Sequence, residues 1–251
     1  MKNKLRMISI DCWGTILIDQ AAWSEEIYTF VCDALGKHNS HIDDRVFKSA
    51  WEAENNLFVA SLEQDHVTPH NTERVRRIAH SLGLGLSEFE LGRIGASIDE
   101  VVARLPPQVR SGASEFLHDV HRRGLCVSVV SNTGWLSGEA VGATLRNLSL
   151  GPTIEHMFFS DVVGCAKPCR RIFEVALAAW GCSSADCAHI GDTPATDIKG
   201  AASVRIHGIY LCPLDRSPGV ESPCFVDFES IAAYLDRIFE FKSSAERLGR
   251  S

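Results

Sequence analysis

The chain has 251 residues, of which 45% are hydrophobic and 23% are charged. These proportions are typical of a globular protein with a sizeable buried core, and they exclude a disordered or low-complexity chain. The formal net charge is −7, and no block of Lys and Arg interleaved with aromatic residues occurs. Both features argue against nucleic acid as a partner, so we expect a small-molecule ligand.

The nine cysteines are scattered along the chain, in odd number and without a CxxC pair. This pattern favours reduced thiols over a zinc site or a disulfide framework. The first residues lack the apolar region of a signal peptide, and no apolar run is long enough to cross a bilayer. We therefore expect a cytoplasmic protein without a membrane partner, and a homodimer stays open.

Residues 7–10, Met-Ile-Ser-Ile, predict a short buried strand because apolar and β-branched side chains dominate them. Asp11 follows this strand directly, and Gly14 allows the backbone beside it to approach a bound group. In open α/β sheets, ligands bind at the carboxyl ends of the strands. Asp11 is therefore a candidate site residue, and the alternative is an aspartate that begins an ordinary turn.

Residues from about 19 to 105 carry apolar side chains at helical spacing and contain no convincing strand. Pro106 and Pro107 end this region, because proline disfavours helix both at its own position and at the residue before it. We expect an all-helical insertion, called the cap below. The predicted division is a core of residues 1–18 and 106–241, a cap of residues 19–105 and a polar tail of residues 242–251.

Strand and helix patterns alternate beyond Pro107. Apolar runs predict strands at residues 126–130, 156–159, 187–190 and 206–211, and helical spacing predicts helices at residues 113–123, 171–180 and 228–241. This alternation indicates βαβ units. We therefore expect an α/β fold with a mostly parallel sheet and an inserted helical cap.

Polar residues follow the predicted strands at the edge where a ligand would bind. They are Asp11, Ser131, Asp192 with Asp197, and Lys167 at a helix entrance. Taken singly, each has an ordinary structural explanation: a turn or cap for the serine, a solvated surface lysine, and a helix N-cap for Asp192. Their order and spacing together favour a site.

The whole series resembles the four motifs of the haloacid dehalogenase superfamily of hydrolases. The matching residues are Asp11-x-x-Gly14-Thr15, Ser131-Asn132, Lys167-Pro168 and Gly191-Asp192-x-x-x-x-Asp197. The resemblance covers essentially the whole chain and implies a Rossmann-like core, with residues 19–105 at the position of that family's helical cap. It also implies a phosphorylated small-molecule substrate and Mg²⁺ as cofactor.

Residue roles follow from this resemblance. Asp11 matches the nucleophile that forms an aspartyl-enzyme ester, and Ser131 matches the group that binds the transferring phosphoryl oxygens. Lys167 matches the cation that offsets negative charge. The resemblance implies that the metal is bound by Asp11, Asp192, Asp197 and the main-chain carbonyl of Trp13, and that the substrate is bound by Trp13, Gly14, Thr15, Asn132 and Thr133.

Trp13 is the main departure from the family. Phosphatases of the superfamily carry a second aspartate at this position, which gives a proton to the leaving group and takes one from water, and indole can do neither. Losing such a group typically costs about 10²–10⁴ in rate. Another residue could supply the proton, and His66, His70 and Asp19 are the candidates in the cap region.

Alternatives to a phosphatase stay open. Dehalogenases of the superfamily also carry an aromatic residue at the position of Trp13, but they lack the Gly191-Asp192 pair and place an arginine beside a cap aromatic, where this chain has Glu52 after Trp51. Phosphonate-cleaving relatives use a cap lysine, for which Lys48 is the candidate, although a bulky Trp13 argues against them. The remaining alternative is a non-catalytic relative that binds a phosphorylated ligand.

Overall fold

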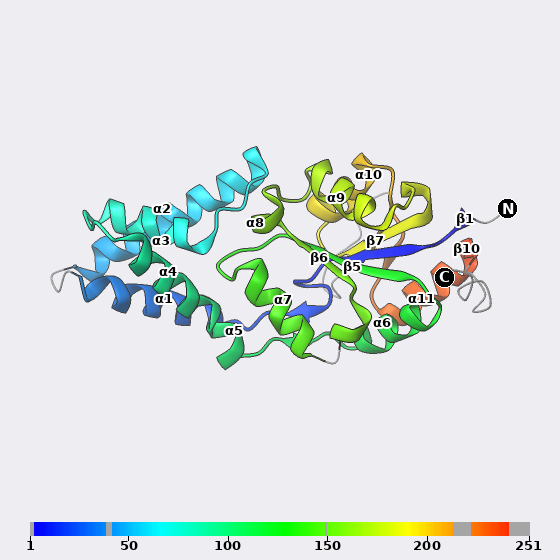
Figure 1. Cartoon of the computed structure of the whole chain (residues 1–251), viewed down its shortest axis with the longest axis horizontal. Coiled ribbons are helices and arrows are strands. Elements are labelled where there is room, and N and C mark those ends of the chain that lie inside the picture. Colours follow the sequence, from blue (N-terminus) through cyan, green and yellow to red (C-terminus); the bar gives the residue numbers. More distant parts are fainter. Residues whose placement is uncertain (1–2, 39–41, 149, 213–221, 241–251) are drawn as a thin grey trace.

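A parallel sheet forms the centre of the core in the computed structural model, which describes residues 3–38, 42–148, 150–212 and 222–240. Its six strands all pair in parallel, in the order β6-β5-β2-β7-β8-β9 (Figure 1). The strands are β2 (Met7–Ile10), β5 (Cys126–Ser131), β6 (His156–Phe159), β7 (Cys187–Gly191), β8 (His207–Leu211) and β9 (Cys224–Phe225). The predicted α/β fold with a mostly parallel sheet is confirmed.

The strand β2 lies in the middle of this sheet, and all four of its residues are buried. Ile10 is in register with Val129 of β5 and with Ile190 of β7. Since the three strands are parallel, the residues that follow them emerge at one edge of the sheet. This register brings the loops after residues 10, 131 and 191 together.

Helices cover both faces of the sheet because successive side chains of each strand point to opposite sides. Ile8 and Ile10 belong to a core shared with α6 (Ala113–Arg122), α7 (Gly138–Asn147) and α11 (Phe228–Ile238). Met7 belongs to a core on the other face, shared with α9 (Arg170–Trp180) and α10 (Lys199–Ser203). Figure 1 shows these two helical layers below and above the strands.

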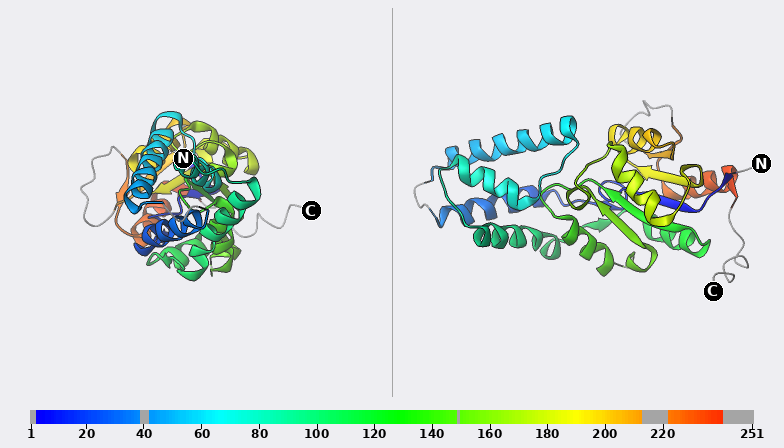
Figure 2. Two further views of the ribbon diagram at one scale, coloured as in Figure 1. Left: turned by 90° about the vertical axis from the view of Figure 1, so that its left-hand side faces the viewer. Right: turned by 45° about the horizontal axis from the view of Figure 1, so that its top comes forward.

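The cap is a helical insertion after β2. It contains α1 (Ala22–Gly36), α2 (Asp44–Ala60), the π-helical turn η1 (Ser61–Asp65), α3 (Asn71–Ser81), α4 (Glu88–Asp99) and α5 (Val101–Arg104). The chain enters and leaves it through β3 (Leu17–Ile18) and β4 (Gln108–Val109), which pair antiparallel. Figure 2 shows the cap helices side by side at one end of an elongated molecule. The exact division into a core of 1–18 and 106–241 and a cap of 19–105 stays a prediction.

Some elements differ from the sequence-based expectation. The helix expected at 228–241 ends at Ile238, because Phe239 and Glu240 form β10, which pairs with β1 (Asn3–Lys4). The helix α7 and the strand β9 had no counterpart among the expected elements. The polar tail predicted at 242–251 lies outside the described residues.

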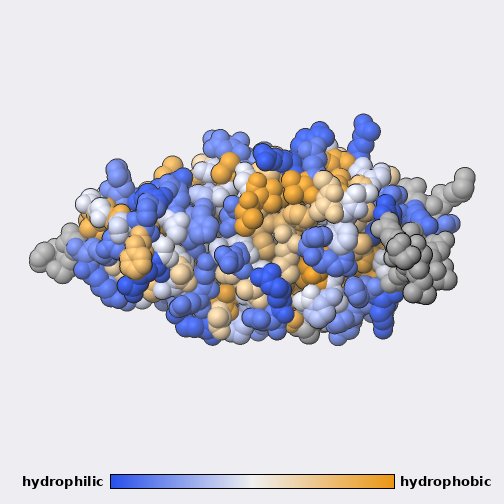
Figure 3. Space-filling view, in the orientation of Figure 1, coloured by the Kyte–Doolittle hydropathy of each residue, from blue (hydrophilic) through white to orange (hydrophobic). Residues whose placement is uncertain are grey.

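The shorter elements complete the chain. They are α8 (Ser160–Val163), η2 (Gly151–Thr153), η3 (Ser184–Asp186) and the π-helical turn η4 (Pro194–Ile198). On the face shown in Figure 3, apolar side chains gather over β6 and α8, where Val162 is largely exposed. None of the helices described is long and apolar enough to span a membrane. All nine cysteines are free thiols, as the sequence predicted.

Candidate active site

The residues that follow β2, β5 and β7 surround one cavity of about 400 Å³ at the carboxyl edge of the sheet. The cavity is lined by Asp11, Trp13, Gly14, Asp19, Leu62, Ser131, Asn132, Lys167, Asp192, Thr193 and Thr196. Most residues that the sequence singled out therefore meet at this place. Thr15 and Thr133 do not line the cavity: Thr15 is buried, and Thr133 donates its backbone N–H to the Ser160 hydroxyl at 2.9 Å.

Lys167 connects two carboxylates beneath this cavity. Its Nζ atom lies 2.5 Å from Oδ1 of Asp11 and 2.5 Å from Oδ1 of Asp197, and the side chain is only 2% exposed. Burial opposes the charged form of the lysine, but the charges of the two aspartates raise its pKa. Lys167 is therefore a permanent buried cation next to Asp11.

Asn132 holds the backbone of Lys167. Its side-chain oxygen accepts from the Lys167 N–H at 2.7 Å, and its side-chain nitrogen donates to the Lys167 carbonyl at 3.0 Å. This pair of bonds uses both ends of the half-buried amide. The geometry makes Asn132 a residue that positions the lysine, in addition to lining the cavity.

The three carboxylates have different electrostatic environments. Burial and the charges of the other two aspartates raise the pKa of Asp192 to about 6. Burial also raises the pKa of Asp11, although Lys167 opposes that shift. Burial acts in the same direction on Asp197, but the charge of Lys167 and a hydrogen bond from His189 lower its pKa to about 2. Lys167 thus pairs with Asp11 and Asp197, and Asp192 is the carboxylate outside this pairing.

Asp11, Asp192 and Asp197 could together hold a metal ion, because one oxygen of each lies within 4.8 Å of the others. Both oxygens of Asp197 already have partners: Oδ1 accepts from Lys167, and Oδ2 accepts from the Thr193 N–H at 2.9 Å. Among the described residues, the only hydrogen-bond donor to the Asp192 side chain is the Thr193 hydroxyl, at 3.3 Å. A hard cation with oxygen ligands would neutralise the repulsion that raises the pKa of Asp192.

Gly14 is required next to this cluster. Its φ is +75°, and a Cβ atom added there would lie 2.3 Å from Oδ2 of Asp192. A side chain at this position would therefore be strained and would displace the carboxylate. The Asp11-x-x-Gly14 spacing thus leaves room for Asp192 from a different strand.

Trp13 forms a wall of the cavity. Its ring meets the ring of Trp23 edge to face, with centroids 5.1 Å apart. That Trp13 replaces an acid of the family stays a prediction. Among the described residues, only Asp19 adds a further carboxylate to the cavity lining. His66 and His70, the other candidate proton donors, do not line the cavity, and the side chain of His70 caps α3 instead.

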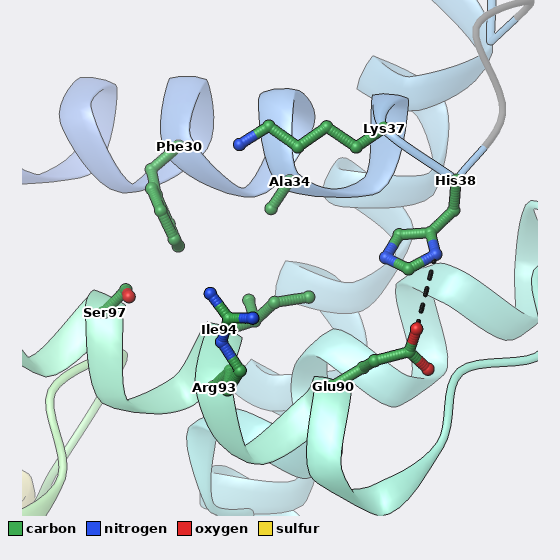
Figure 4. A pocket seen from close by; sticks show the side chains of 8 residues that line it. All are labelled: Phe30, Ala34, Lys37, His38, Glu90, Arg93, Ile94 and Ser97. Atoms are coloured by element: carbon green, nitrogen blue, oxygen red, sulfur yellow. Dashed lines mark ion pairs between the residues drawn. The ribbon is translucent and has the colours of Figure 1, made fainter.

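Other cavities lie apart from Asp11. Lys48 forms an exposed pair with Glu52 at 3.9 Å and lines a different surface cavity, so it does not meet Asp11. A cavity of about 310 Å³ between α1 and α4 is lined by Lys37, His38 and Arg93 among others (Figure 4). It contains none of the predicted site residues.

The sequence did not single out His189, Leu62, Thr193 or Thr196. His189 lies fully buried in β7, with its Nε2 atom 3.3 Å from Oδ1 of Asp197 and its Nδ1 atom 2.9 Å from the Ser9 hydroxyl. A histidine inside an otherwise apolar strand is the signal that could have revealed it. The three residues that line the cavity carry no such signal.

A parallel sheet with a helical insertion after its central strand carries a carboxylate–lysine cluster at its carboxyl edge, which is the arrangement of a Rossmann-like enzyme core with a helical cap. A sequence model of the haloacid dehalogenase-like hydrolase family matches residues 5–205. The chain belongs to this family. The predicted family and the predicted class of enzyme, a hydrolase, are confirmed.

Relatives agree with this assignment. The chain is 32% identical over 115 residues to a phosphoserine phosphatase of Thermus thermophilus, which covers 44% of this chain and 42% of that protein. It is 31% identical over 144 residues to the haloacid dehalogenase-like hydrolase domain-containing protein 3 of Bos taurus, which covers 56% of each. The chain thus spans about half the length of the curated relatives that it matches.

Solved structures of the fold include both chemistries that the sequence left open. A HAD phosphatase from Thermococcus onnurineus has a TM-score of 0.67 at 16% identity, covering 92% of this chain and 98% of that one. A 2-haloacid dehalogenase from Pseudomonas syringae has a TM-score of 0.69 at 18% identity, covering 93% and 99%. At these identities the likeness shows the shared fold.

Proposed function

We propose that this protein is a magnesium-dependent phosphatase that transfers the phosphoryl group of a small-molecule ester to Asp11 and then hydrolyses the aspartyl phosphate. The observation that carries the proposal is the cluster at the sheet edge, in which Lys167 contacts Asp11 while no described residue forms an ion pair with Asp192 nearby. Repulsion between the carboxylates contributes to the raised pKa of Asp192. A divalent cation bound among the carboxylates would relieve that repulsion, and a reaction without a metal would not.

The carboxylates fit such an ion. Asp11, Asp192 and the main-chain carbonyl of Trp13 would hold the magnesium, and Asp197 would position Lys167, to which it is already hydrogen-bonded. When bound, magnesium offsets the negative charge of the phosphate oxygens and of the carboxylates. The phosphorylated substrate is the only partner that this chemistry requires.

In the first step, an Asp11 oxygen attacks phosphorus, and the bond from phosphorus to the leaving oxygen breaks, with the electron pair on that oxygen. Lys167 reduces the repulsion between the carboxylate and the phosphate, and the Ser131 side chain donates to a phosphoryl oxygen. In the second step, water attacks phosphorus and the bond to Asp11 breaks. Inorganic phosphate leaves and the carboxylate is regenerated.

The second step needs a base, and Trp13 cannot serve. Asp19 is a carboxylate of the cavity lining for which the described residues provide no ion pair. We assign Asp19 as the base that accepts the proton of the hydrolytic water. Leaving-group departure in the first step then proceeds without an acid at position 13, so leaving groups that form stable anions should react fastest.

Dehalogenation of a short haloacid is the second candidate, and Trp13 is the observation that favours it, because a halide leaves without a proton. Turnover of 4-nitrophenyl phosphate beside 2-chloropropionate, with and without magnesium, separates the two. The proposal predicts magnesium-dependent phosphate release that Asp11→Asn abolishes. Metal-independent chloride release, without phosphate release, would contradict the phosphatase proposal and support a dehalogenase.

A further inference from the structure

A second cavity of about 190 Å³ adjoins the one that contains Asp11, and Trp13 and Asp19 are walls of both. It lies where the cap meets the core. Its lining includes Trp13, Trp23 and Trp135 together with Asp19, Gln20 and Ser24. A phosphate held at Asp11 would therefore have its ester group next to this compartment.

Three tryptophans form its walls, and contacts outside the compartment fix two of them. The indole N–H of Trp23 donates to the Leu105 carbonyl at 2.8 Å. Trp135 stacks on Trp51, with centroids 4.5 Å apart and planes 5° from parallel, and the Arg74 guanidinium carbon lies 3.7 Å from the Trp135 centroid. Two groups at these distances must occupy opposite faces of the ring. Trp135 is thus held rigidly.

The size and the three tryptophans favour one flat ring, beside the polar lining residues Asp19, Gln20 and Ser24. A cavity of about 150 Å³ with apolar walls holds a benzene molecule, so about 190 Å³ accommodates one substituted ring. Aromatic rings pack edge to face against one another with a gain beyond the area that they bury. The compartment also offers the carboxylate of Asp19, for which an occupant with a hydrogen-bond donor or a positive charge would be the complement.

The chemistry of Trp13 points to the same class of compound. With no acid at that position, the departing oxygen must carry its negative charge alone, and a phenolate does so more readily than an alkoxide. We propose that the substrate, given the phosphatase function above, is a phosphate monoester of a single-ring phenol that carries a donor or cationic substituent, with its ring among Trp13, Trp23 and Trp135. Asp11 receives the phosphoryl group and the phenolate leaves with the electron pair.

The ring is tested with three substrates. Phenyl phosphate is compared with hexafluoroisopropyl phosphate, whose alcohol is about as acidic as phenol but has no ring, and with acetyl phosphate, which reports only the Asp11 chemistry. We expect kcat/KM for phenyl phosphate to exceed that for the fluoroalkyl ester by about tenfold or more. Trp23→Leu should bring the ratio of the two kcat/KM values close to one, and Trp23→Phe should retain most of the preference for phenyl phosphate. The ratio is measured within each variant, so a loss of folded protein cancels.

The substituent is tested with 4-(aminomethyl)phenyl phosphate beside 4-carboxyphenyl phosphate. In single-turnover phenol release, which precedes the step that uses Asp19 as a base, the cationic ester should react about tenfold faster, and Asp19→Asn should remove this preference. Turnover of acetyl phosphate with equal kcat/KM for aryl and fluoroalkyl esters would overturn the proposed substrate class while leaving the phosphatase function standing. No turnover of any of these esters would overturn the phosphatase function itself.

Discussion

At the scale of single residues, the site depends on one buried lysine among three aspartates. Lys167 contacts Asp11 and Asp197 at 2.5 Å each, and it is fully enclosed. Buried charges are tolerated when they are paired, and removing one partner leaves the others uncompensated. The lysine therefore supports both the fold and the reaction.

Replacing the lysine should damage both. Lys167→Met should lower the free energy of unfolding of the metal-free protein by about 3 kcal/mol and lower kcat/KM by at least about 10²-fold. Urea denaturation in EDTA and steady-state kinetics measure the two effects. Lys199→Met, at an exposed lysine on α10, is the matched control and should change neither. Unchanged kinetics in a folded Lys167→Met protein would remove the lysine from the mechanism.

Asp192 makes stability depend on pH when no metal is present. Its pKa is about 6 in the folded protein, against an ordinary value of 3.8. A carboxyl group whose pKa is raised by folding stabilises the fold below its unfolded pKa, and that stability is lost as the pH rises through the folded pKa. The loss between the two values is at most about 3 kcal/mol.

The measurement is the melting temperature in EDTA from about pH 4 to about pH 7. The native protein should lose stability over this range relative to Asp192→Asn, because asparagine has no carboxyl group that can ionise. Saturating magnesium should restore the melting temperature of the native protein and should not raise that of the variant. Parallel curves for the two proteins would show that Asp192 is not under this electrostatic strain.

At the scale of elements, β7 carries a histidine, His189, that positions Asp197 from inside the sheet. Burial lowers the pKa of His189, so the ring is neutral. Asp197 can only accept, so Nε2 carries the proton and donates to Asp197, and Nδ1 accepts from the Ser9 hydroxyl. Ser9 of β2 and His189 of β7 thus position Asp197, which in turn accepts a hydrogen bond from Lys167.

This arrangement predicts a loss in kcat without a comparable change in KM. His189→Leu should lower kcat by about tenfold or more, and His189→Gln, which keeps a donor, should recover part of the loss. His207→Gln on β8, where the ring bonds to Tyr234 instead, is the control. A change confined to the melting temperature would make His189 a structural residue only.

The same element scale explains what the sequence could predict. The strand at 126–130 was found because a run of apolar and β-branched residues has few other uses. The run at 187–190 is shorter and has one β-branched residue, Ile190, and it was recognised together with the Gly191-Asp192 pair that follows it. The two-residue strands β9 and β10 have no periodicity to detect. The helix α7 escaped notice because it has a glycine at both 138 and 142, where added Cβ atoms would meet the Phe159 side chain. Tertiary packing, which the sequence does not display, makes those glycines useful.

The candidate site could be assembled from the sequence only as a set of strand ends. Asp11 and Asp192 follow buried strands, so parallel register alone brought them together. The bonds between Asn132 and the Lys167 backbone join segments 35 residues apart and leave no pattern in the sequence. The hydrogen bond from the Thr133 backbone N–H to the Ser160 hydroxyl likewise leaves no pattern in the sequence.

At the scale of the whole molecule, cap and core are joined by side chains from both. Trp135, from the loop after β5, lies between Trp51 and Arg74 of the cap. The cap residue Asp99 accepts from the backbone N–H and the hydroxyl of Ser137 at 2.8 and 2.7 Å. These contacts close the cap over the loop that follows Ser131, the last residue of β5.

Removing the ring should loosen this junction. Trp135→Ala should lower the free energy of unfolding by about 2 kcal/mol and increase the radius of gyration measured by small-angle X-ray scattering. Phe89→Ala, at an aromatic residue of the cap that is 74% exposed, is the matched control and should alter neither value. An unchanged scattering curve for a folded Trp135→Ala protein would show that other contacts hold the cap closed.

The most direct measurement is to trap the covalent intermediate. The protein is mixed with a radiolabelled phosphate ester and magnesium, quenched within a turnover and digested, and the labelled peptide is sequenced. The account predicts the label on Asp11, and none on the Asp11→Asn variant. A label on any other residue, or direct transfer to water in a protein that turns over the ester, would contradict the central claim that Asp11 is the nucleophile.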